Sequence, residues 1–248
     1  MRIAAIYDIH GNLPALEAVL AEIRRAKADE IVVGGDVIPG PMPRETLQCL
    51  LDLAIPVRFI QGNGDRVVLG AMRGEEPTEI PEQFREQIRW NARQLTAKHE
   101  TVLASWPKTI RVEIDGVGQV VFCHATPRND TGVFTRLTPE DRLRPIFQDI
   151  NADLVVCGHT HMQFDRTIGA LRVINAGSVG MPFGEPGAYW LLLGPGIELR
   201  HTPYDFAQAA GRIRQTNHPG AQEFAECKVL RPPSEKEMLE MFAKVPLK

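Results

Sequence analysis

The sequence predicts an α+β protein in which two facing β-sheets form one domain, with helices on their outer sides. Three observations support this fold class. The first sixty residues alternate strand-like apolar runs with helical patterns, which favours a parallel sheet covered by helices. The second half consists mostly of short strand-like runs. The chain has 248 residues, of which 44% are hydrophobic, and this is enough for one large core.

The expected elements follow one another in two groups along the chain. In the first group, strands are expected at 2–7, 30–34 and 57–60, with helices at 13–27 and 43–53. Because these strands alternate with helices, they are expected to run parallel, with the loops after them gathered at one edge of the sheet. In the second group, a hairpin turn is expected at Asp115-Gly116, and the strands are expected at 109–114, 119–124, 153–159, 171–177, 188–193 and 197–201.

Residues 66–108 belong to neither group and predict a helical cap inserted into a single domain that spans residues 1–248. A turn-rich stretch, RGEEPTEIP, precedes one long helical pattern over 82–106. Trp90 lies off the apolar face of this helix, and partial burial at a helix contact is favoured over contact with a substrate or a second subunit. The apolar residues near one face are Phe84, Ile88, Leu95, Val102 and Trp106.

Composition and charge exclude several classes of function. A net charge of -3 argues against a broad basic surface, so we expect no stable nucleic-acid or membrane partner, while a homo-oligomer stays open. The apolar run at the N-terminus stops at Asp8, too early for a signal peptide, and a cytoplasmic location is expected. The four cysteines show no metal or disulfide spacing, and Cys123 and Cys157 are expected to be small buried hydrophobic residues.

Side chains able to bind metals follow most of the expected strands. Each block has a plain alternative: Asp36 as a helix cap, His124 as a buried core histidine, and Asn63-Gly64 as a hairpin turn. All the blocks stand at strand ends, where loops converge, so a shared site is favoured over separate coincidences. The blocks are DIH (8–10), GD (35–36), GNGD (62–65), CH (123–124) and GHTH (158–161).

The ligand set predicts two metal ions. Seven ligands are too many for one four-coordinate ion with an open position, and they suit two ions that share a carboxylate. A mixture of imidazole nitrogen and oxygen ligands favours Mn, Fe or Zn over Ca or Mg. The sequence therefore predicts a site for two ions that share one carboxylate.

These blocks, with CHATPR (123–128) and INAGSVG (174–180), resemble the calcineurin-like metallophosphoesterases, in particular their small prokaryotic phosphodiesterase branch. The resemblance implies a β-sandwich of two mixed sheets flanked by helices. It also implies a dinuclear metal-dependent phosphoesterase in which a metal-bridging hydroxide attacks phosphorus, with Mn as the expected metal and Fe, Zn or Ni as alternatives. The implied partner is a small phosphoester, since two divalent ions leave local positive charge that attracts phosphate. The implied ligands are Asp8, His10, Asp36 and His161 for one ion, and Asp36, Asn63, His124 and His159 for the other, with Asp36 bridging.

The sequence departs from the family pattern in two blocks. Gly64 stands where many members have a histidine that protonates the leaving oxygen, and glycine has no side chain to do so. The stretch GDVIPGP (35–41) lacks the GDxxDRG motif of the Ser/Thr phosphatases. Both departures favour a phosphodiesterase, and Gly64→His suggests itself as a test. The alternatives are a phosphomonoesterase or nucleotide phosphohydrolase and, from another class, a non-catalytic metal-binding scaffold for protein interaction.

Individual roles follow from the resemblance and from position. Asp36, Asn63 and His124 are the expected catalytic residues, and Asp65 is expected to orient a ligand or its loop without contacting the metal. Asn12 and Arg128 are candidate substrate-binding residues. For Asn12 capping of the first helix is the favoured alternative, and for Arg128 a salt bridge to Asp130 or another surface acid is equally plausible. The remaining histidines fit no ligand pattern and are expected at the surface: His99, His201 and His218.

Overall fold

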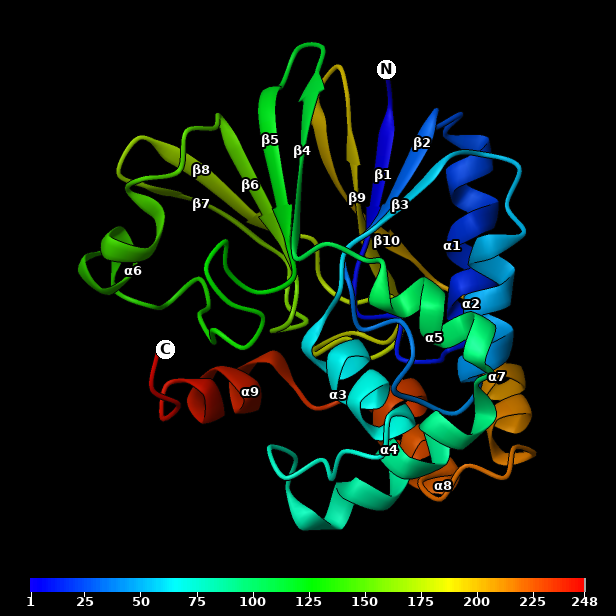
Figure 1. The fold of residues 1–248 in the computed structure, drawn as a ribbon. Helices are drawn as coiled ribbons and strands as arrows, with labels where there is room; N and C mark the ends of the chain where they lie inside the picture. Colours follow the sequence, from blue (N-terminus) through cyan, green and yellow to red (C-terminus); the bar gives the residue numbers. More distant parts are fainter. Residues whose placement is uncertain (248) are drawn as a thin grey trace.

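Two mixed five-stranded sheets pack face to face in the structure, a computed structural model that describes residues 1–247 (Figure 1). The predicted fold class is therefore confirmed. The first sheet has the strand order β10 (Ile197–Thr202), β9 (Ala188–Leu193), β1 (Ile3–Ile6), β2 (Glu30–Val33) and β3 (Val57–Phe59). The second has the order β4 (Thr109–Ile114), β5 (Gly118–Cys123), β6 (Leu154–Cys157), β8 (Leu171–Asn175) and β7 (Phe164–Ile168).

Parallel pairing brings the carboxyl ends of several strands to one edge. In the first sheet β1, β2 and β3 run parallel, and β9 pairs antiparallel with β1 and β10. In the second sheet β4 and β5 form the expected antiparallel hairpin, and β5, β6 and β8 run parallel. The loops that follow β1, β2, β3, β5 and β6 all leave at the lower edge in Figure 1.

The main core lies between the sheets and follows the two-residue alternation of the strands. Ile3 and Ala5 on one face of β1 pack in the same buried cluster as Phe122 of β5. Ile6, on the opposite face of β1, packs in a second cluster with Leu16 of the first helix. Successive side chains of a strand point to opposite faces, so β1 serves both cores at once.

Helices cover the outer faces of the sheets and extend below the carboxyl edge (Figure 1). The first helix begins after Asn12, whose side-chain oxygen accepts a hydrogen bond from the backbone N–H of Ala15. The helices are α1 (Leu13–Arg25), α2 (Pro43–Leu51), α3 (Asn63–Met72), α4 (Glu82–Gln94), α5 (Ala97–Ala104), α6 (Glu140–Phe147), α7 (Phe206–Arg214), α8 (Ala221–Phe224), the π-helix η1 (Ala225–Leu230) and α9 (Glu235–Phe242).

The expected single helix over 82–106 is wrong, because the chain breaks it into α4 and α5. Leu95 and Thr96 adopt extended backbone, and the Thr96 hydroxyl accepts from the backbone N–H of His99 to start α5. The helix before them, α3, packs against both α4 and α5. Trp90 is half-buried, as favoured, and it meets edge-on the ring of His218, which lies in the loop between α7 and α8 and not in a helix.

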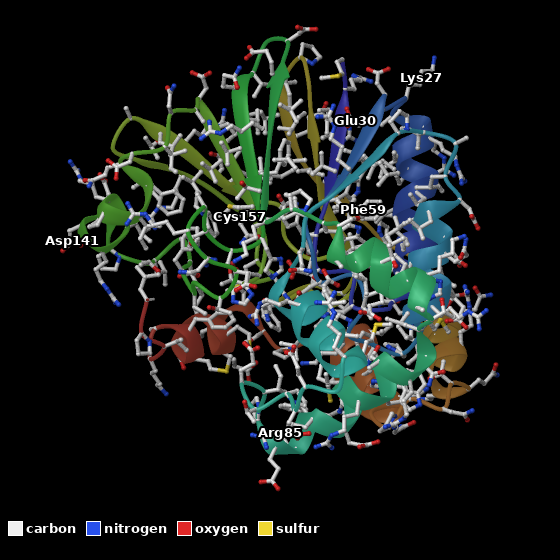
Figure 2. All side chains as sticks on the ribbon, viewed as in Figure 1. Lys27, Glu30, Phe59, Arg85, Asp141 and Cys157 are labelled. Atoms are coloured by element: carbon white, nitrogen blue, oxygen red, sulfur yellow. The ribbon has the colours of Figure 1, made fainter. Side chains whose placement is uncertain are left out.

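Cysteines and surface charges lie where their chemistry predicts. Cys123 and Cys157 are fully buried free thiols at strand ends, as expected. In Figure 2, Lys27 and Asp141 project from the surface, whereas Cys157 lies in the interior. Across residues 1–247, every helix is too short or too polar to cross a lipid bilayer.

Candidate metal centre

The predicted ligands come together below the carboxyl edge of both sheets. Asp8 and His10 follow β1, Asp36 follows β2, and Asn63 opens α3 directly after β3. The second sheet contributes three histidines, one after β5 and two after β6: His124, His159 and His161. Backbone hydrogen bonds from Asp8 N to Gly35 O and from His10 N to Asp36 O hold the first two loops against each other.

Most of these residues occupy a backbone conformation that L-amino acids rarely adopt. Five of the six non-glycine residues with positive φ in the part of the chain described here are predicted ligands, and the sixth is Lys27. Each such residue costs about 1–2 kcal/mol relative to ordinary backbone. The strained positions are Asp8 (φ 52°), His10 (50°), Asp36 (53°), His159 (66°) and His161 (58°). Strain concentrated at one cluster is typical of a functional site.

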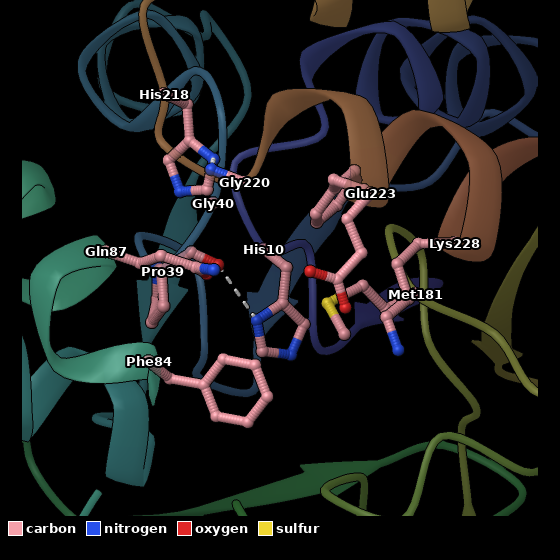
Figure 3. A pocket seen from close by; sticks show the side chains of 11 residues that line it. His10, Pro39, Gly40, Phe84, Gln87, Met181, His218, Gly220, Glu223 and Lys228 are labelled. Carbon is pink, nitrogen blue, oxygen red and sulfur yellow. Dashed lines mark hydrogen bonds between the residues drawn. The ribbon is translucent and has the colours of Figure 1, made fainter. Parts of the chain in front are cut away.

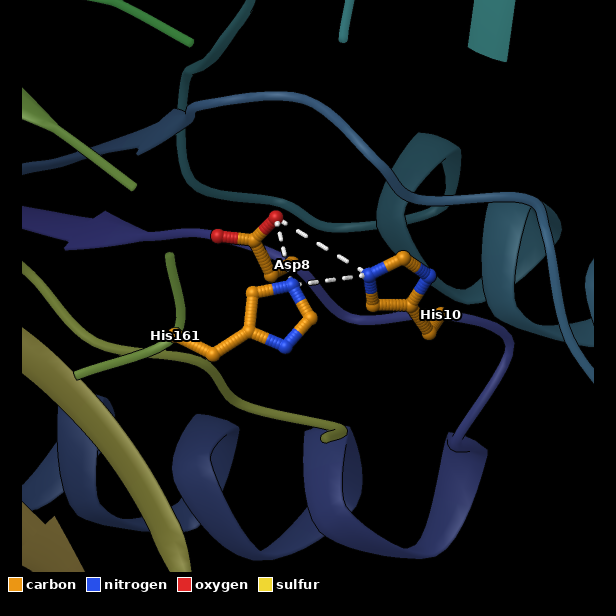
Figure 4. Close-up of side chains that lie close together, drawn as sticks. All are labelled: Asp8, His10 and His161. Carbon is orange, nitrogen blue, oxygen red and sulfur yellow. Dashed lines mark hydrogen bonds and ion pairs between the residues drawn. The ribbon is translucent and has the colours of Figure 1, made fainter. Parts of the chain in front are cut away.

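Asp8, His10 and His161 form the first cluster (Figure 4). The Nε2 atom of His161 lies 3.3 Å from Asp8 Oδ1 and 3.3 Å from His10 Nε2. The His10 Nε2 atom lies 3.8 Å from Asp8 Oδ1. Neighbouring ligands about 2.1 Å from one ion are about 3 Å apart when they meet at right angles, so this spacing suits a shared cation.

Asp36 and His124 form the second cluster together with Asp8. The His124 Nε2 atom lies 3.7 Å from Asp36 Oδ1 and 3.9 Å from Asp8 Oδ1. The amide head of Asn63 is 2.9 Å from His124 Nε2 and, with its NH₂ turned to donate, 3.0 Å from His159 Nδ1. All seven predicted ligands therefore take part in one continuous group.

Hydrogen bonds from the backbone orient three of the histidine rings. The Nδ1 atoms of His10, His124 and His161 lie 3.1, 2.9 and 2.7 Å from the carbonyl oxygens of Pro39, Gly34 and Met181, respectively. A carbonyl only accepts, so each Nδ1–H donates and each Nε2 lone pair is left facing the cluster. Each of these imidazoles thus directs one ring nitrogen to the place where a metal ion would bind.

Asp8 provides the test of whether a cation fits. Its side chain is fully buried, and its Oδ1 has no hydrogen-bond partner among residues 1–247. Its Oδ2 accepts from the backbone N–H of His159 at 2.8 Å. A buried carboxylate oxygen without a partner is costly, and a cation between Asp8 and the histidine nitrogens removes that cost. The residues present therefore fit a metal centre.

Burial and nearby charges shift the pKa values of these groups in different directions. Burial lowers the pKa of His10 and His159 to about 4, so both are neutral near pH 7. Burial alone would lower the pKa of His124 too, but the charges of Asp36 and Asp8 outweigh it and raise that pKa. For Asp8, burial is outweighed by His161 and the other histidines, which hold its pKa well below the usual range.

We expect the metal-free protein to lose stability as the pH falls from about 6.5 to about 4. In the unfolded chain His10 and His159 return to an ordinary pKa of 6.5, against about 4 in the folded protein. Between these values the unfolded state binds more protons, so acidification favours unfolding, and below about pH 4 the loss is complete. Urea unfolding of EDTA-treated protein at pH 7, 6, 5 and 4 measures the effect. The variant His10→Gln/His159→Gln should show a shallower fall; an equal slope in both proteins would contradict the prediction.

Asp65 holds the loop that carries Asp36. Its carboxylate is fully buried and accepts hydrogen bonds from four backbone N–H groups. The donors and distances are Asp36 N (2.8 Å), Val37 N (2.9 Å), Ile38 N (3.1 Å) and Gly62 N (3.1 Å). Asp65 thus ties the β2 loop to the start of α3, and its orienting role at a metal site stays a prediction.

Gly64 is confined by a close approach of Pro39. A Cβ atom at residue 64 would lie 2.5 Å from Pro39 Cγ and 3.0 Å from Asp36 Oδ1. A histidine there requires Pro39 to move. The substitution Gly64→His, which the sequence suggests, would therefore alter the packing around Pro39 as well as adding an imidazole. The two departures from the family pattern, in GDVIPGP and in GNGD, are thus in direct contact.

We expect Gly64→Ala to lower the free energy of unfolding by about 1–3 kcal/mol, the usual cost of overpacking. Pro39→Ala removes the Cγ atom that a new Cβ would meet at 2.5 Å, so the double variant should recover much of the loss. Urea unfolding of the two single variants and the double variant completes the cycle. Strictly additive effects would show that Pro39 is not what excludes a side chain at residue 64.

The remaining candidates lie around the cluster with other partners. Asn12 is fully buried and caps α1 by accepting from the backbone N–H of Ala15, and its amide NH₂ donates separately to Gly180 O at 2.9 Å. Arg128 pairs with the surface acid Asp149 at 3.1 Å, whereas Asp130 pairs with Arg66 at 2.6 Å. Substrate contact through Asn12 or Arg128 stays a prediction.

Two of the three histidines expected at the surface are buried, so that expectation is wrong for them. His99 is 6% exposed because its Nδ1 accepts from the backbone N–H of Thr96 in the capping of α5. His218 is also 6% exposed, packed against Trp90 while its Nδ1 accepts from Gly220 N at 3.1 Å. Only His201 of the three is exposed.

The C-terminal part of the chain adds residues to the site that no sequence motif indicates. Phe183 stacks on the ring of His161, with ring centroids 5.1 Å apart. A cavity of about 320 Å³ opens beside His10, and residues of α8 and η1 line it opposite α4 (Figure 3). The sequence of this region shows only short helical patterns, which predict helices but do not indicate which side chains line a site.

Comparison with known proteins decides which family this centre belongs to. A model described as the calcineurin-like phosphoesterase superfamily domain matches residues 1–193, a range that contains all seven clustered side chains. The chain belongs to the calcineurin-like phosphoesterase superfamily. It is accordingly a metal-dependent phosphoesterase, a hydrolase that acts on phosphoester bonds. The resemblance drawn from the motifs is confirmed.

Three relatives illustrate how far the likeness extends. An uncharacterized protein of Methanocaldococcus jannaschii is 31% identical over 238 residues, covering 88% of this phosphoesterase and 93% of that protein. The crystal structure of a metallophosphoesterase from Sphaerobacter thermophilus superposes with a TM-score of 0.71 at 26% identity, over 92% of this chain and 99% of that one. A hypothetical protein from Pyrococcus horikoshii has a TM-score of 0.81 at 20% identity, over 94% and 99% of the two chains, and shares the fold.

Proposed function

We propose that this phosphoesterase is a dinuclear metal-dependent phosphodiesterase. One observation carries the dinuclear part. Asp36 presents a different oxygen to each side of the cluster: Oδ2 lies 3.8 Å from His10 Nε2, and Oδ1 lies 3.7 Å from His124 Nε2. A carboxylate in this position can bridge two ions, one on the side of His10 and one on the side of His124.

Asp8 is the competing bridge, because its Oδ1 belongs to both clusters. Asp8 offers one and the same oxygen to both sides, and its Oδ2 accepts the backbone N–H of His159. Asp36 turns a separate oxygen to each side, although its Oδ1 also accepts the backbone N–H of Gly64, and on this ground we assign it as the bridge. We assign Asp8, His10 and His161 to the first ion, with Asp36 shared, and Asn63, His124 and His159 to the second.

The residues of the chain prepare the site for a phosphate group. Two bound divalent ions supply Lewis acidity, which lowers the pKa of a coordinated water and neutralises phosphate oxygens. The backbone carbonyls of Pro39, Gly34 and Met181 hold three histidines with Nε2 inward, and Asp65 fixes the loop of Asp36. The nitrogen and oxygen donor set supports Mn as the metal, with Fe, Zn or Ni as alternatives.

The preference for diesters rests on the surroundings of Gly64. Residue 64 carries no side chain, and Pro39 fills the space where one would begin. No side chain at that position can then transfer a proton or add a contact for the second negative charge of a monoester. A diester has one negative charge and a second organic group, for which the cavity beside His10 offers room.

The test combines elemental analysis of the purified protein with assays of bis(4-nitrophenyl) phosphate and 4-nitrophenyl phosphate in Mn, Fe, Zn or Ni. We expect two metal equivalents per chain and a kcat/KM for the diester at least about 10-fold above that for the monoester, with Mn the strongest activator. Faster hydrolysis of the monoester would support the phosphomonoesterase alternative. A protein that binds no metal and hydrolyses neither compound would point to the scaffold alternative.

A further inference from the structure

The cavity beside His10 has two walls of different origin. Phe84 and Gln87 of α4 form one wall, and Glu223 and Lys228 of α8 and η1 face them across it (Figure 3). His10, a member of the metal cluster, lines the same space. A cavity of about 320 Å³ with apolar walls and a few polar groups is the usual form of a site for a small organic group.

Lys228 differs from the arginines near the metal cluster because it lacks an acidic partner. Arg66 is engaged by Asp130 at 2.6 Å and by Glu79 at 2.7 Å, and Arg128 is engaged by Asp149 at 3.1 Å. Among the ion pairs found within residues 1–247, none includes Lys228. The nearest acid along its own helix, Glu226, pairs instead with Arg214 and Arg231. The ammonium group of Lys228 is therefore available to a ligand in the cavity.

Lys228 lies in the π-helix η1, which follows α8 and its residue Glu223. Glu223 and Lys228 are five residues apart and line the same space. In an α-helix the residue stacked one turn after Glu223 is its fourth successor, Cys227, which here is exposed and does not line the cavity. A π-helix closes i→i+5 turns, and such turns are uncommon and occur frequently at functional sites.

Cleavage of a phosphodiester calls for a proton on the leaving oxygen. When the P–O bond breaks, the electron pair stays on the leaving oxygen, which needs a proton unless its anion is stable. Gly64 has no side chain, and the Nε2 atoms of His10, His124 and His161 face the cluster as acceptors. A side chain that donates this proton, as distinct from water, therefore lies outside the group of ligands.

We propose that the cavity receives the organic leaving group of the substrate and that Lys228 donates a proton to its oxygen. This inference rests on the proposed phosphodiesterase function and adds to it a class of substrate: diesters whose leaving group is a bulky, partly apolar alcohol or phenol of high basicity. In the step, water oxygen bonds to phosphorus, the bond from phosphorus to the leaving oxygen breaks, and a proton from Lys228 Nζ completes the free alcohol. The attacking water releases one proton to solvent and Lys228 takes one up, so protons balance.

The experiment compares two diesters that differ in the leaving group alone, 4-nitrophenyl methyl phosphate and phenyl methyl phosphate, in saturating Mn. The anion of 4-nitrophenol is stable near neutral pH, whereas phenol itself has an ordinary pKa of about 10 and needs the proton. We expect Lys228→Met to reduce kcat for the phenyl ester about 100-fold or more, and for the 4-nitrophenyl ester less than about 10-fold. Lys228→Arg, which keeps the charge but does not give up its proton, should not restore hydrolysis of the phenyl ester.

Matched controls separate this role from a structural one. Lys236→Met removes an exposed lysine of α9 that does not line the cavity, and it should leave both rates unchanged. Melting temperature and bound metal are measured for each variant. Equal losses on both esters, unchanged rates, or full rescue by Lys228→Arg would overturn the proposal. A parent protein that hydrolyses neither ester would contradict the phosphodiesterase function itself, and the role of Lys228 with it.

Discussion

Asp36→Asn should reduce kcat/KM for a phosphodiester at least about 100-fold and lower the bound metal, while the protein still folds. Substitution of groups that only support a metal ligand costs about 10–100-fold, so loss of the bridging charge should cost at least the upper value. The asparagine oxygen can still accept the backbone N–H of Gly64, which Asp36 Oδ1 accepts at 2.7 Å, so the loop should keep its shape. Kinetics, elemental analysis and thermal unfolding together measure the three effects.

His201→Ala is the matched control for this substitution. His201 is exposed on β10 and contacts Tyr189 and Pro186 O, with no member of the metal cluster among its partners. Activity and metal content should match those of the parent. Parental turnover by Asp36→Asn would exclude Asp36 as the bridge, and retention of two metal equivalents without turnover would limit its role to the chemical step.

Asp65→Ala should produce the largest loss of stability among substitutions around the site. The variant leaves four buried backbone N–H groups without an acceptor, those of Asp36, Val37, Ile38 and Gly62. At about 1 kcal/mol or more for each unsatisfied donor, the free energy of unfolding should fall by about 4 kcal/mol or more. Such a loss is a large part of the usual 5–15 kcal/mol, and urea unfolding of the metal-loaded protein measures it.

Asp205→Ala is the matched control for Asp65→Ala. Asp205 also accepts a backbone N–H, from Gln208 at 2.9 Å, but at the exposed start of α7 where water can replace it. Loss of such a cap costs about 1 kcal/mol. If the two variants lose the same amount, burial of the Asp65 network does not contribute the extra stability.

Local sequence patterns were sufficient to predict the strand-end loops and their polar residues. The loops after β1, β2, β3, β5 and β6 lie at one edge because parallel strands end there, and this rule needs no knowledge of distant contacts. The sign of φ at those residues was not predictable, since aspartate and histidine seldom adopt left-handed backbone. That conformation is imposed by hydrogen bonds between loops that are distant in the sequence.

Other features depend on contacts that a single stretch of sequence does not contain. Strand β7 was missed because it is a short edge strand whose middle residues, Asp165 and Arg166, are charged. Helix α6 was missed because Pro145 lies inside it and obscures the helical pattern. The break between α4 and α5 depends on one threonine acting as a cap within an otherwise continuous apolar pattern.

The metal ligands and one wall of the cavity come from different parts of the chain, which affects how homologues of this protein can diverge. All seven clustered side chains lie within the 1–193 match to the superfamily, whereas Glu223 and Lys228 lie beyond it. Substitutions in the C-terminal segment can thus change one wall of this cavity, including the proposed donor Lys228, while every ligand loop keeps its sequence. Exchanging residues 204–230 between homologues therefore changes that wall on an unchanged set of metal ligands.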